Sequence, residues 1–311
     1  MPTPMIQKQW ADYLTPAAKV WWSQTLNSTA SPLMQFMDIR SSVKPTEYSQ
    51  GTGSFGLVPE YNAATAESNG TGLHYDSFSP LYEATFTHKE YADGVEIERK
   101  LWDDGREMEI RSKIMSLAMS YTDTRAYHAS GILNNAFATV TGYDDVYLCS
   151  ASHPTNMVDS TAVSNLGTTA LSYAAVVATL VAGYSFKNDR GLPLPSRFNI
   201  LYVPFALQGK AIEIVNAMGK PGTADNDANA IDKMVQNGIV VIPDPFLTDT
   251  NNWFMIDSEK ASMHAIWYNH TLPEFEFDPT GSYNLVARYR GYMRYSYGWD
   301  DFRWIYGHNV S

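Results

Sequence analysis

Polar and apolar residues alternate with a period of two before residue 90, which is typical of a half-buried β-strand. The mostly apolar face comprises Tyr82, Ala84, Phe86 and His88. The polar face comprises Glu83, Thr85, Thr87 and Lys89. Asp93 and Gly94 follow, and this dipeptide favours a tight turn between two strands. We therefore expect a strand that leads into a turn at Asp93.

Beyond this turn, mostly apolar residues recur at spacings of three and four, the pattern of an amphipathic helix. These positions are Ile110, Ile114, Leu117, Ala118, Tyr121, Arg125, His128, Ala129, Ile132 and Leu133. The pattern predicts a helix of about 25 residues. At 1.5 Å per residue it would reach roughly 40 Å, longer than the average helix of a globular domain.

Two segments precede the strand. The stretch "AAKVWWSQTLN" indicates an amphipathic helix, for which we expect Thr15 before the helix and Pro16 at its first position. Residues 41–78 are rich in Gly, Ser, Thr, Asn and Ala and form a weakly apolar connection of about forty residues. A connection of this length should be functional or mobile.

Residues 143–270 alternate helix-like and strand-like segments, which predicts an α/β or α+β module. Helices are expected at "TTALSYAAVVATLVAGY" and "FALQGKAIEIVNAM", and strands at "RFNILYVP", "GIVVIP" and "NWFMIDSE". The closing segment "YNLVARYRGYMRYSYGWDDFRWIYGHN" is strand-like again and very aromatic. The chain as a whole is thus expected to be α+β.

The stretch "LVARYRGYMRYSY" places its arginines on one face of a strand. The opposite face comprises Leu285, Ala287, Tyr289, Gly291, Met293, Tyr295 and Tyr297. Arg288, Arg290 and Arg294 would repel one another without nearby carboxylates. We expect Glu83, Glu90 and Glu96 to share the sheet, and acidic patches on neighbouring molecules are further candidate partners. The alternative is a basic stripe that is merely solvated.

Composition and charge narrow the function. The formal net charge of -11 disfavours direct nucleic-acid recognition, which normally depends on clustered Lys and Arg. Cys149 is the single cysteine, so no intramolecular disulfide forms, and synthesis in a reducing cytoplasm is expected. The N-terminal stretch shows no signal-peptide core, and the run "YAAVVATLVAGY" is too short to span a bilayer.

Two motif-like stretches fail their context tests. "GTGSFG" at residues 51–56 matches the spacing of a dinucleotide-binding loop, but Pro59 blocks the helix that should follow. "DNDANAIDKMVQ" at residues 225–236 imitates a calcium loop, yet it has Ala230 and Gln236 where glycine and glutamate are required. We expect a flexible loop and a polar surface loop, and no cofactor.

Catalytic alternatives depend on residues that the sequence cannot bring together. Seven histidines are scattered without a pair at i and i+4, which disfavours a zinc site. Cys149 and His153 could form a thiol dyad only if they meet in space. The carboxylate pairs that would suit a glycosidase are Asp103 with Asp104, Glu274 with Glu276, and Asp300 with Asp301. A carboxylate-dependent hydrolase is therefore the alternative of a different class.

The order of these elements, together with several specific segments, resembles the major capsid proteins of tailed phages with the Hong Kong 97-type fold. The Mu-like major head subunits are the nearest group. The segments that carry the resemblance are "FSPLYEATFTHKEYADGVEIERKLWDD", "YHASGILNNAF", "YLCSASHPTN", "NLGTTALSYAAVVAT" and "YRGYMRYSYGWDDFRWIYGHN".

This resemblance implies a division of the chain. Residues 1–40 would be an N-terminal arm, and residues 41–78 an extended hairpin called the E-loop. Residues 79–144 would form the peripheral (P) domain, with a spine helix from Arg106 to Leu133. Residues 145–270 would be the axial (A) domain, and residues 271–311 would return to the P domain and end the chain.

The resemblance also implies a function. The chain would self-assemble as hexamers and pentamers into an icosahedral shell around double-stranded DNA, without catalysis, a cofactor or a membrane. It would be synthesised and assembled in the host cytoplasm and end in the virion. Expected partners are a separate scaffolding protein, because the arm begins almost at once, a portal and a decoration protein. An encapsulin-like shell or another virion structural protein is the alternative.

Overall fold

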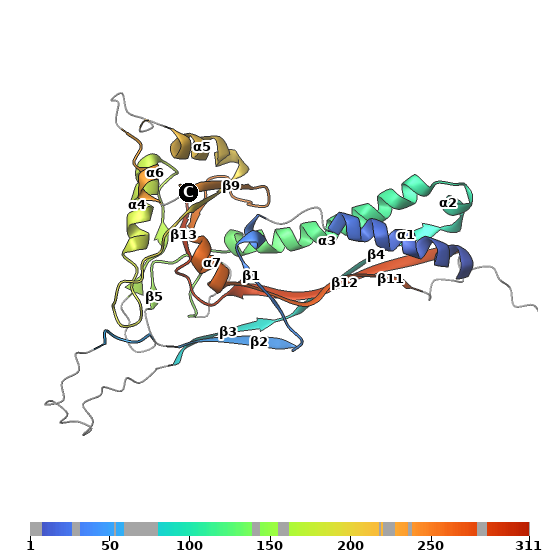
Figure 1. Ribbon diagram of the computed structural model, residues 1–311, viewed down its shortest axis with the longest axis horizontal. Helices are drawn as coiled ribbons and strands as arrows, with labels where there is room; N and C mark the ends of the chain where they lie inside the picture. Colours follow the sequence, from blue (N-terminus) through green and yellow to red (C-terminus); the bar gives the residue numbers. More distant parts are fainter. Residues whose placement is uncertain are drawn as a thin grey trace, which may run out of the picture. The chain divides into compact units, whose positions relative to one another are not determined.

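The structure is a computed structural model. It describes residues 8–26, 32–52, 54–58, 80–138, 144–154, 162–217, 219, 228–235, 238–278 and 285–310. The chain divides into two compact units (Figure 1). Unit 1 contains the described parts of Met1–Glu47, Phe86–Leu133 and Ile266–Gly298, and unit 2 contains those of Tyr48–Thr85, Asn134–Ala265 and Trp299–Ser311.

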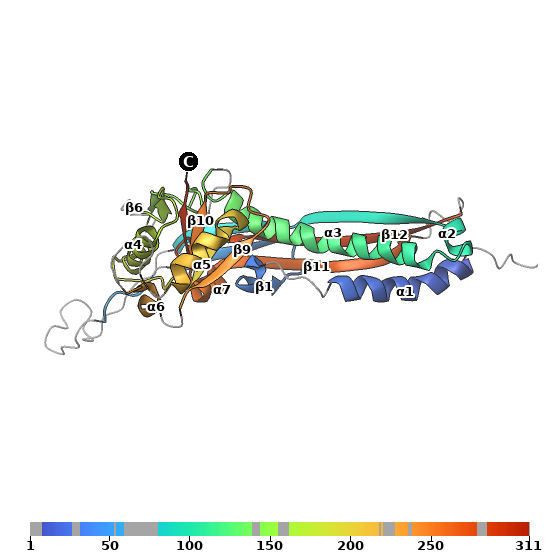
Figure 2. The same cartoon turned by 90° about the horizontal axis from the view of Figure 1, so that it is seen from above.

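Unit 1 is built on a four-stranded sheet with the order β1-β11-β12-β4. Its strands are β1 (Asp38–Ser41), β4 (Lys89–Glu98), β11 (Ala265–Asp278) and β12 (Val286–Trp299). Its helices are α1 (Lys8–Leu26), η1 (Leu33–Gln35), α2 (Arg99–Asp103) and α3 (Glu107–Asn134). Helices α1 and α3 run lengthwise along the long strands β11 and β12 (Figures 1 and 2).

Aromatic side chains join the helices of unit 1 to its sheet. Trp22 of α1 stacks on Phe275 of β11 and meets the ring of Tyr121 of α3 edge-on. Phe275 in turn stacks on Tyr289 of β12 at 5.3 Å between ring centroids. Rings of this size bury much apolar surface, and such ring pairs add a further increment of stability.

Unit 2 contains a five-stranded sheet with the order β7-β13-β10-β8-β9. These strands are β7 (Leu166–Gly167), β8 (Ile200–Pro204), β9 (Val240–Asp244), β10 (Trp253–Ile256) and β13 (Ile305–His308). The helices are α4 (Tyr173–Tyr184), η3 (Phe205–Leu207), α5 (Gln208–Asn216), α6 (Ile231–Met234) and α7 (Ser258–His264). Apolar residues of α4 and α5 form one buried core with β8 and β10.

Two small ladders complete the described structure. Strand β2 (Thr46–Thr52) pairs with β3 (Pro80–Thr87), and β5 (His153–Pro154) pairs with β6 (Ala162–Val163). Most of the predicted connection after β2, residues 59–79, lies outside the described residues.

The long helix predicted between Arg106 and Leu133 is confirmed, since α3 spans Glu107–Asn134 and 28 residues. Most of the positions chosen from their spacing are buried, and Arg125 and His128 are partly buried. The strand-like segments expected at residues 197–204, 238–243 and 252–259 correspond to β8, β9 and β10, respectively. The predicted strand at Tyr82 also forms, with Ala84 and Phe86 buried.

The turn predicted at Asp93 and Gly94 is wrong. Both residues lie inside β4 and pair with Gly291 and Arg290 of β12. A Cβ atom at Gly94 would lie 2.8 Å from the backbone oxygen of Tyr289, so glycine serves a close approach of two strands here. An Asp-Gly dipeptide suits both a tight turn and a close approach of two strands, and only the neighbouring strand β12 shows which of these forms here.

The predicted start of the first helix is also wrong. α1 begins at Lys8 and contains Pro16 in its interior. Proline there cannot donate a backbone hydrogen bond, which usually costs about 3 kcal/mol. Leu14, Ala18 and Trp22 are buried on both sides of it, so tertiary packing compensates for this loss.

Candidate subunit-contact surface

The three arginines of β12 lie on the sheet face opposite α3, as their alternation predicts. Ala287, Tyr289, Gly291, Met293 and Tyr295 are buried on the other face. Tyr121 of α3 contacts that face at Gly291. Successive side chains of a strand point to opposite faces, so Arg288, Arg290 and Arg294 point away from this helix.

Each of these arginines has a carboxylate neighbour. Arg288 Nε lies 2.7 Å from Glu96 Oε1, and Arg294 Nε lies 3.9 Å from Glu90 Oε1. Both glutamates are on β4, directly opposite their arginines in the strand register. Neither Nε atom has a hydrogen-bonded partner, so these contacts are ionic rather than well-directed hydrogen bonds.

Arg290 pairs with a different strand. Its partner in the β4 register is Gly94, which has no side chain to offer. Arg290 Nη2 instead donates to Glu276 Oε2 of β11 at 3.1 Å. We call the three arginines with Glu90, Glu96 and Glu276 the charged row.

The charged row contributes little to the stability of the single chain. The side chains of Arg290 and Glu276 are 63% and 57% exposed, and the other two glutamates are similarly exposed. Exposed ion pairs typically contribute about 0.2 to 1 kcal/mol each. A row of alternating charges on an open sheet face is thus available to a neighbouring molecule.

Glu83 is not part of the charged row. It lies on β3, which pairs with β2 in a separate ladder and not with β12. The prediction that Glu83 shares the arginine sheet is therefore wrong, whereas the sheet placement of Glu90 and Glu96 is confirmed. Sequence reasoning missed Glu276 as an arginine partner, although the glycine at position 94 was a signal that β4 leaves Arg290 uncovered.

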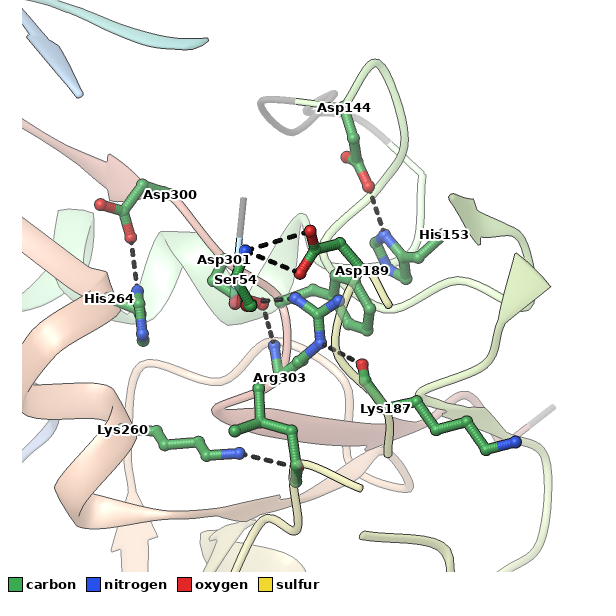
Figure 3. A network of polar contacts seen from close by, with 12 residues as sticks. Ser54, Asp144, His153, Lys187, Asp189, Lys260, His264, Asp300, Asp301 and Arg303 are labelled. Carbon is green, nitrogen blue, oxygen red and sulfur yellow. Dashed lines mark hydrogen bonds and ion pairs between the residues drawn. The ribbon is translucent and has the colours of Figure 1, made fainter. Parts of the chain in front are cut away.

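His153 is held by groups other than Cys149. Its Nδ1 lies 2.7 Å from Asp144 Oδ2 (Figure 3). Its Nε2 lies 3.3 Å from the Leu148 carbonyl, and its ring stacks on Phe302. Cys149 is buried, and this burial raises the pKa of its thiol far above the ordinary range. A buried neutral thiol and an imidazole that other groups hold do not provide the activated nucleophile of a thiol dyad.

His264 and Asp300 form a second pair in unit 2 (Figure 3). His264 Nδ1 lies 2.9 Å from Asp300 Oδ1, and Ser49 donates to the other carboxylate oxygen at 2.7 Å. Burial lowers the pKa of His264, but the hydrogen bond to Asp300 and the charges of Asp301 and Asp300 outweigh it, so the pKa is raised. The serine here binds the carboxylate and not the imidazole, unlike a catalytic triad.

Four of the six carboxylates considered for hydrolysis have a basic partner among the described residues. Asp103 pairs with Arg99, and Glu276 pairs with Arg290. Asp300 holds His264, and Asp301 binds Arg303 at 2.9 Å. Arg303 also donates to the Lys187 carbonyl (Figure 3). These contacts account for Asp103, Glu276, Asp300 and Asp301 as members of structural ion pairs.

A nearby lysine and serine are also engaged. Lys260 Nζ donates to Ser196 Oγ at 2.8 Å, and burial lowers the pKa of this lysine. Ser196 is fully buried and donates its hydroxyl proton to the Arg303 carbonyl at 2.6 Å. The serine is therefore a connector between Lys260 and the segment that contains Arg303.

The motif-like stretches have no supporting geometry where they are described. Residues 54–58 contain no helix, and the Ser54 amide donates to both carboxylate oxygens of Asp189 (Figure 3). The calcium-like stretch falls partly outside the described residues, which include only 228–235 of it. Within the described part of the chain, no group of three metal-binding side chains comes together. The helices described there include none long and apolar enough to cross a membrane.

Solved structures with a similar fold include chains from phage capsid and procapsid structures. A procapsid subunit of bacteriophage JBD30 is 12% identical with a TM-score of 0.56, and the match covers 99% of this chain and 76% of that chain. A chain in the capsid structure of cyanophage P-SCSP1u is 13% identical with a TM-score of 0.55, and the match covers 91% of this chain and 88% of that chain. A chain of Microbacterium phage Oxtober96 is 10% identical with a TM-score of 0.54, and the match covers 91% of this chain and 92% of that chain.

At such identities these structures establish the Hong Kong 97-type fold, and the Mu-like subgroup is not singled out. None of the curated protein sequences compared with the chain matches it. The family model described as "Phage capsid protein" matches residues 82–307, from β3 to β13. This match spans well over half of the sequence, and so the chain belongs to the phage capsid protein family.

Proposed function

We propose that this major capsid protein assembles as hexamers and pentamers into an icosahedral shell that encloses the double-stranded DNA of a tailed bacteriophage. The observation that carries the proposal is the family match over residues 82–307, which includes the charged row on β4, β11 and β12. A face of exposed charged pairs that adds little to the single chain is suited to contacts between copies.

In this proposal the charged row contacts neighbouring subunits. Arg288, Arg290 and Arg294 present cations, and Glu90 and Glu96 present carboxylates that a neighbour can also bind. Glu83 remains a candidate contact from β3. The energy of each contact is small, but it recurs in every copy of a symmetric shell, so it influences whether the lattice closes.

The segments take the roles that the capsid fold suggests. Residues 1–40 act as the arm, 41–78 as the E-loop, and 79–144 as the P domain with α3 as its spine. Residues 145–270 act as the A domain, and 271–311 return to the P domain. The 28-residue α3 and the 14-residue strands β11 and β12 support a stiff strut in unit 1.

The proposed partners are copies of the chain, a separate scaffolding protein, a portal and a decoration protein. Similarity to a subunit of the JBD30 procapsid supports an assembly stage before the mature particle. The net charge of -11 supports a shell that encloses DNA without binding it tightly, because the negatively charged protein and the phosphates repel each other. We place the assembly in the host cytoplasm and assign the chain no catalytic step.

The test is assembly of the purified chain, alone and with a co-expressed scaffolding protein, followed by electron microscopy and sedimentation. Shells or capsomers are expected, and particles purified from infected cells should contain DNA. A cargo enzyme in place of DNA would favour an encapsulin-like shell. A single 34.8 kDa species in every condition would contradict the proposed function.

A further inference from the structure

Among the described residues, three arginines lie over aromatic rings. Arg40 lies over Tyr268 at 5.8 Å, Arg303 over Phe302 at 4.8 Å, and Arg125 over Trp267 at 5.7 Å from the ring centroid. Each arginine follows an aspartate by two residues, in "DIR", "DFR" and "DTR". The same short pattern therefore recurs three times beside an aromatic partner.

Two of these arginines bind their own aspartate. Arg40 contacts Asp38 at 2.6 Å within β1, and Arg303 contacts Asp301 at 2.9 Å in the segment before β13. In an extended strand such as β1, residues two apart lie on the same face. Asp301 and Arg303 instead lie in a bend, where the Arg303 amide also donates to Asp301 Oδ1 at 2.8 Å. The local backbone thus brings each of these two pairs together.

Arg125 cannot bind Asp123 in this way, because the "DTR" segment lies within α3. Two residues turn a helix by roughly 200°, so side chains at i and i+2 do not face each other. Asp123 is exposed, whereas Arg125 lies over Trp267 of β11. The helix has therefore separated the aspartate from the arginine that it would pair with in a strand.

Arg125 consequently has no anionic partner among the described residues. Its Nε is buried and makes no hydrogen bond, and burial lowers the pKa of the guanidinium. Arg125 is only partly buried as a whole, and its two outer guanidinium nitrogens are not among the buried atoms that lack a partner, so this end of the side chain still reaches solvent. A cation removed from water without a partner destabilises the chain that contains it.

We propose that Arg125, lying on Trp267, is a docking point for a carboxylate of a second copy of this chain, and that the site is completed only in the assembled shell. The inference rests on the proposed function and adds a specific contact to it. A guanidinium that lies over a ring and has no anionic partner leaves N–H groups available for a carboxylate that binds through both oxygens.

The charge of the chain favours a second copy over DNA as the source of the anion. Each copy carries 33 acidic and 22 basic residues, so neighbours in a shell bring a surplus of carboxylates. The net charge of -11 opposes the approach of a polyanion. A phosphate ligand is thus the outcome that the experiment must separate from a carboxylate.

The test compares stability and assembly of the Arg125→Met variant. Methionine removes the unpaired charge and keeps apolar contact with Trp267. The unassembled variant should unfold at the same urea concentration as the wild type or a higher one. The protein concentration needed for shell formation should rise at least about tenfold, the effect expected from losing one charge-assisted contact.

Two matched variants serve as controls. Arg303→Met removes an arginine with its own carboxylate, so it should lower the urea midpoint of the unassembled chain. Arg111→Met removes an exposed arginine of the same helix and should change neither stability nor assembly. Arg125→Lys, which keeps the charge without the planar fork, should assemble better than Arg125→Met and worse than the wild type.

The outcomes distinguish this inference from the proposed function. Wild-type protein that forms no shell contradicts the proposed function. Wild-type shells together with unchanged assembly of Arg125→Met overturn the inference alone. Binding of a DNA duplex by the wild type but not by Arg125→Met would identify the ligand as phosphate and also overturn it. If Arg125→Met fails to fold, the density of the wild-type shell decides, by a neighbour's carboxylate within about 4 Å of Arg125 or its absence.

Discussion

Tyr121 of α3 fills the space that Gly291 leaves open in β12. A Cβ atom at Gly291 would lie 2.6 Å from Tyr121 Cζ and 2.7 Å from its hydroxyl oxygen. That hydroxyl accepts a hydrogen bond from the Asp93 amide at 2.6 Å and donates to the Asp93 carbonyl at 3.1 Å. One side chain thus joins the long helix to two neighbouring strands of unit 1.

Gly291→Ala should destabilise the chain by about 1 to 3 kcal/mol, because the added methyl group displaces a buried ring. Urea denaturation of the unassembled protein measures the change. Gly131→Ala is the matched control, since a Cβ there meets no atom within 4 Å and Gly131 lies in α3. That control should stabilise by roughly 0.5 to 1 kcal/mol. Equal effects of the two substitutions would refute the packing explanation.

Tyr121→Phe should keep the ring packing and remove both hydrogen bonds to Asp93. The expected loss is about 1 to 3 kcal/mol, because backbone groups of β4 lose their partner in a part-buried place. Hydrogen exchange of the Asp93 amide should become faster than in the wild type. An unchanged exchange rate at this amide would show that the hydroxyl does not protect it.

Arg290→Glu should leave the subunit folded by circular dichroism and reduce shell yield. The new carboxylate repels Glu276 and any anionic neighbour, so the loss should be larger at low salt than at high salt. Shell yield is measured by sedimentation at both salt concentrations. Normal yield at low salt would mean that this part of the charged row is only a solvated surface.

A charge swap separates contacts within the chain from contacts between copies. The double variant Arg290→Glu with Glu276→Arg restores the ion pair inside one subunit. If the yield depends on that internal pair, the swap should recover it. If the yield depends on a neighbouring subunit, as we propose, the swapped variant should remain defective.

His308 should make the fold less stable in mild acid. Its ring stacks on Trp253 at 3.8 Å, and burial lowers its pKa to about 4. Below an ordinary pKa of about 6.5, the unfolded chain binds a proton that the folded chain resists. Stability should therefore fall by up to roughly 3 kcal/mol as the pH drops from about 6.5 to about 4.

Urea midpoints of wild type and His308→Gln across this pH range measure the effect, and the variant should show a smaller decline. His264→Gln is the opposing control, because the pKa of His264 is raised. Its imidazolium stabilises the fold below the unfolded pKa, and this stabilisation is lost as the pH rises through the folded pKa. Its substitution should therefore cost most in acid. Parallel pH profiles for the two variants would contradict both assignments.

The sequence by itself determined the periodic elements and their faces. The spacings of three and four between Ile110 and Leu133 predicted α3, because a helix places those residues on one buried stripe. Alternation around Tyr289 likewise separated the buried face of β12 from Arg288, Arg290 and Arg294. The order of segments was sufficient to suggest the capsid fold that the family match supports.

Only the tertiary structure decided which residues meet. Gly94 lies within a strand because β12 passes close to it, and Arg290 pairs with Glu276 because Gly94 stands opposite. Arg125 does not pair with Asp123, because the turn of α3 points their side chains in different directions. The same three-residue pattern forms an ion pair at Arg40 and at Arg303. Periodicity is a local property of the backbone, whereas partners depend on strand order and register between segments distant in the sequence.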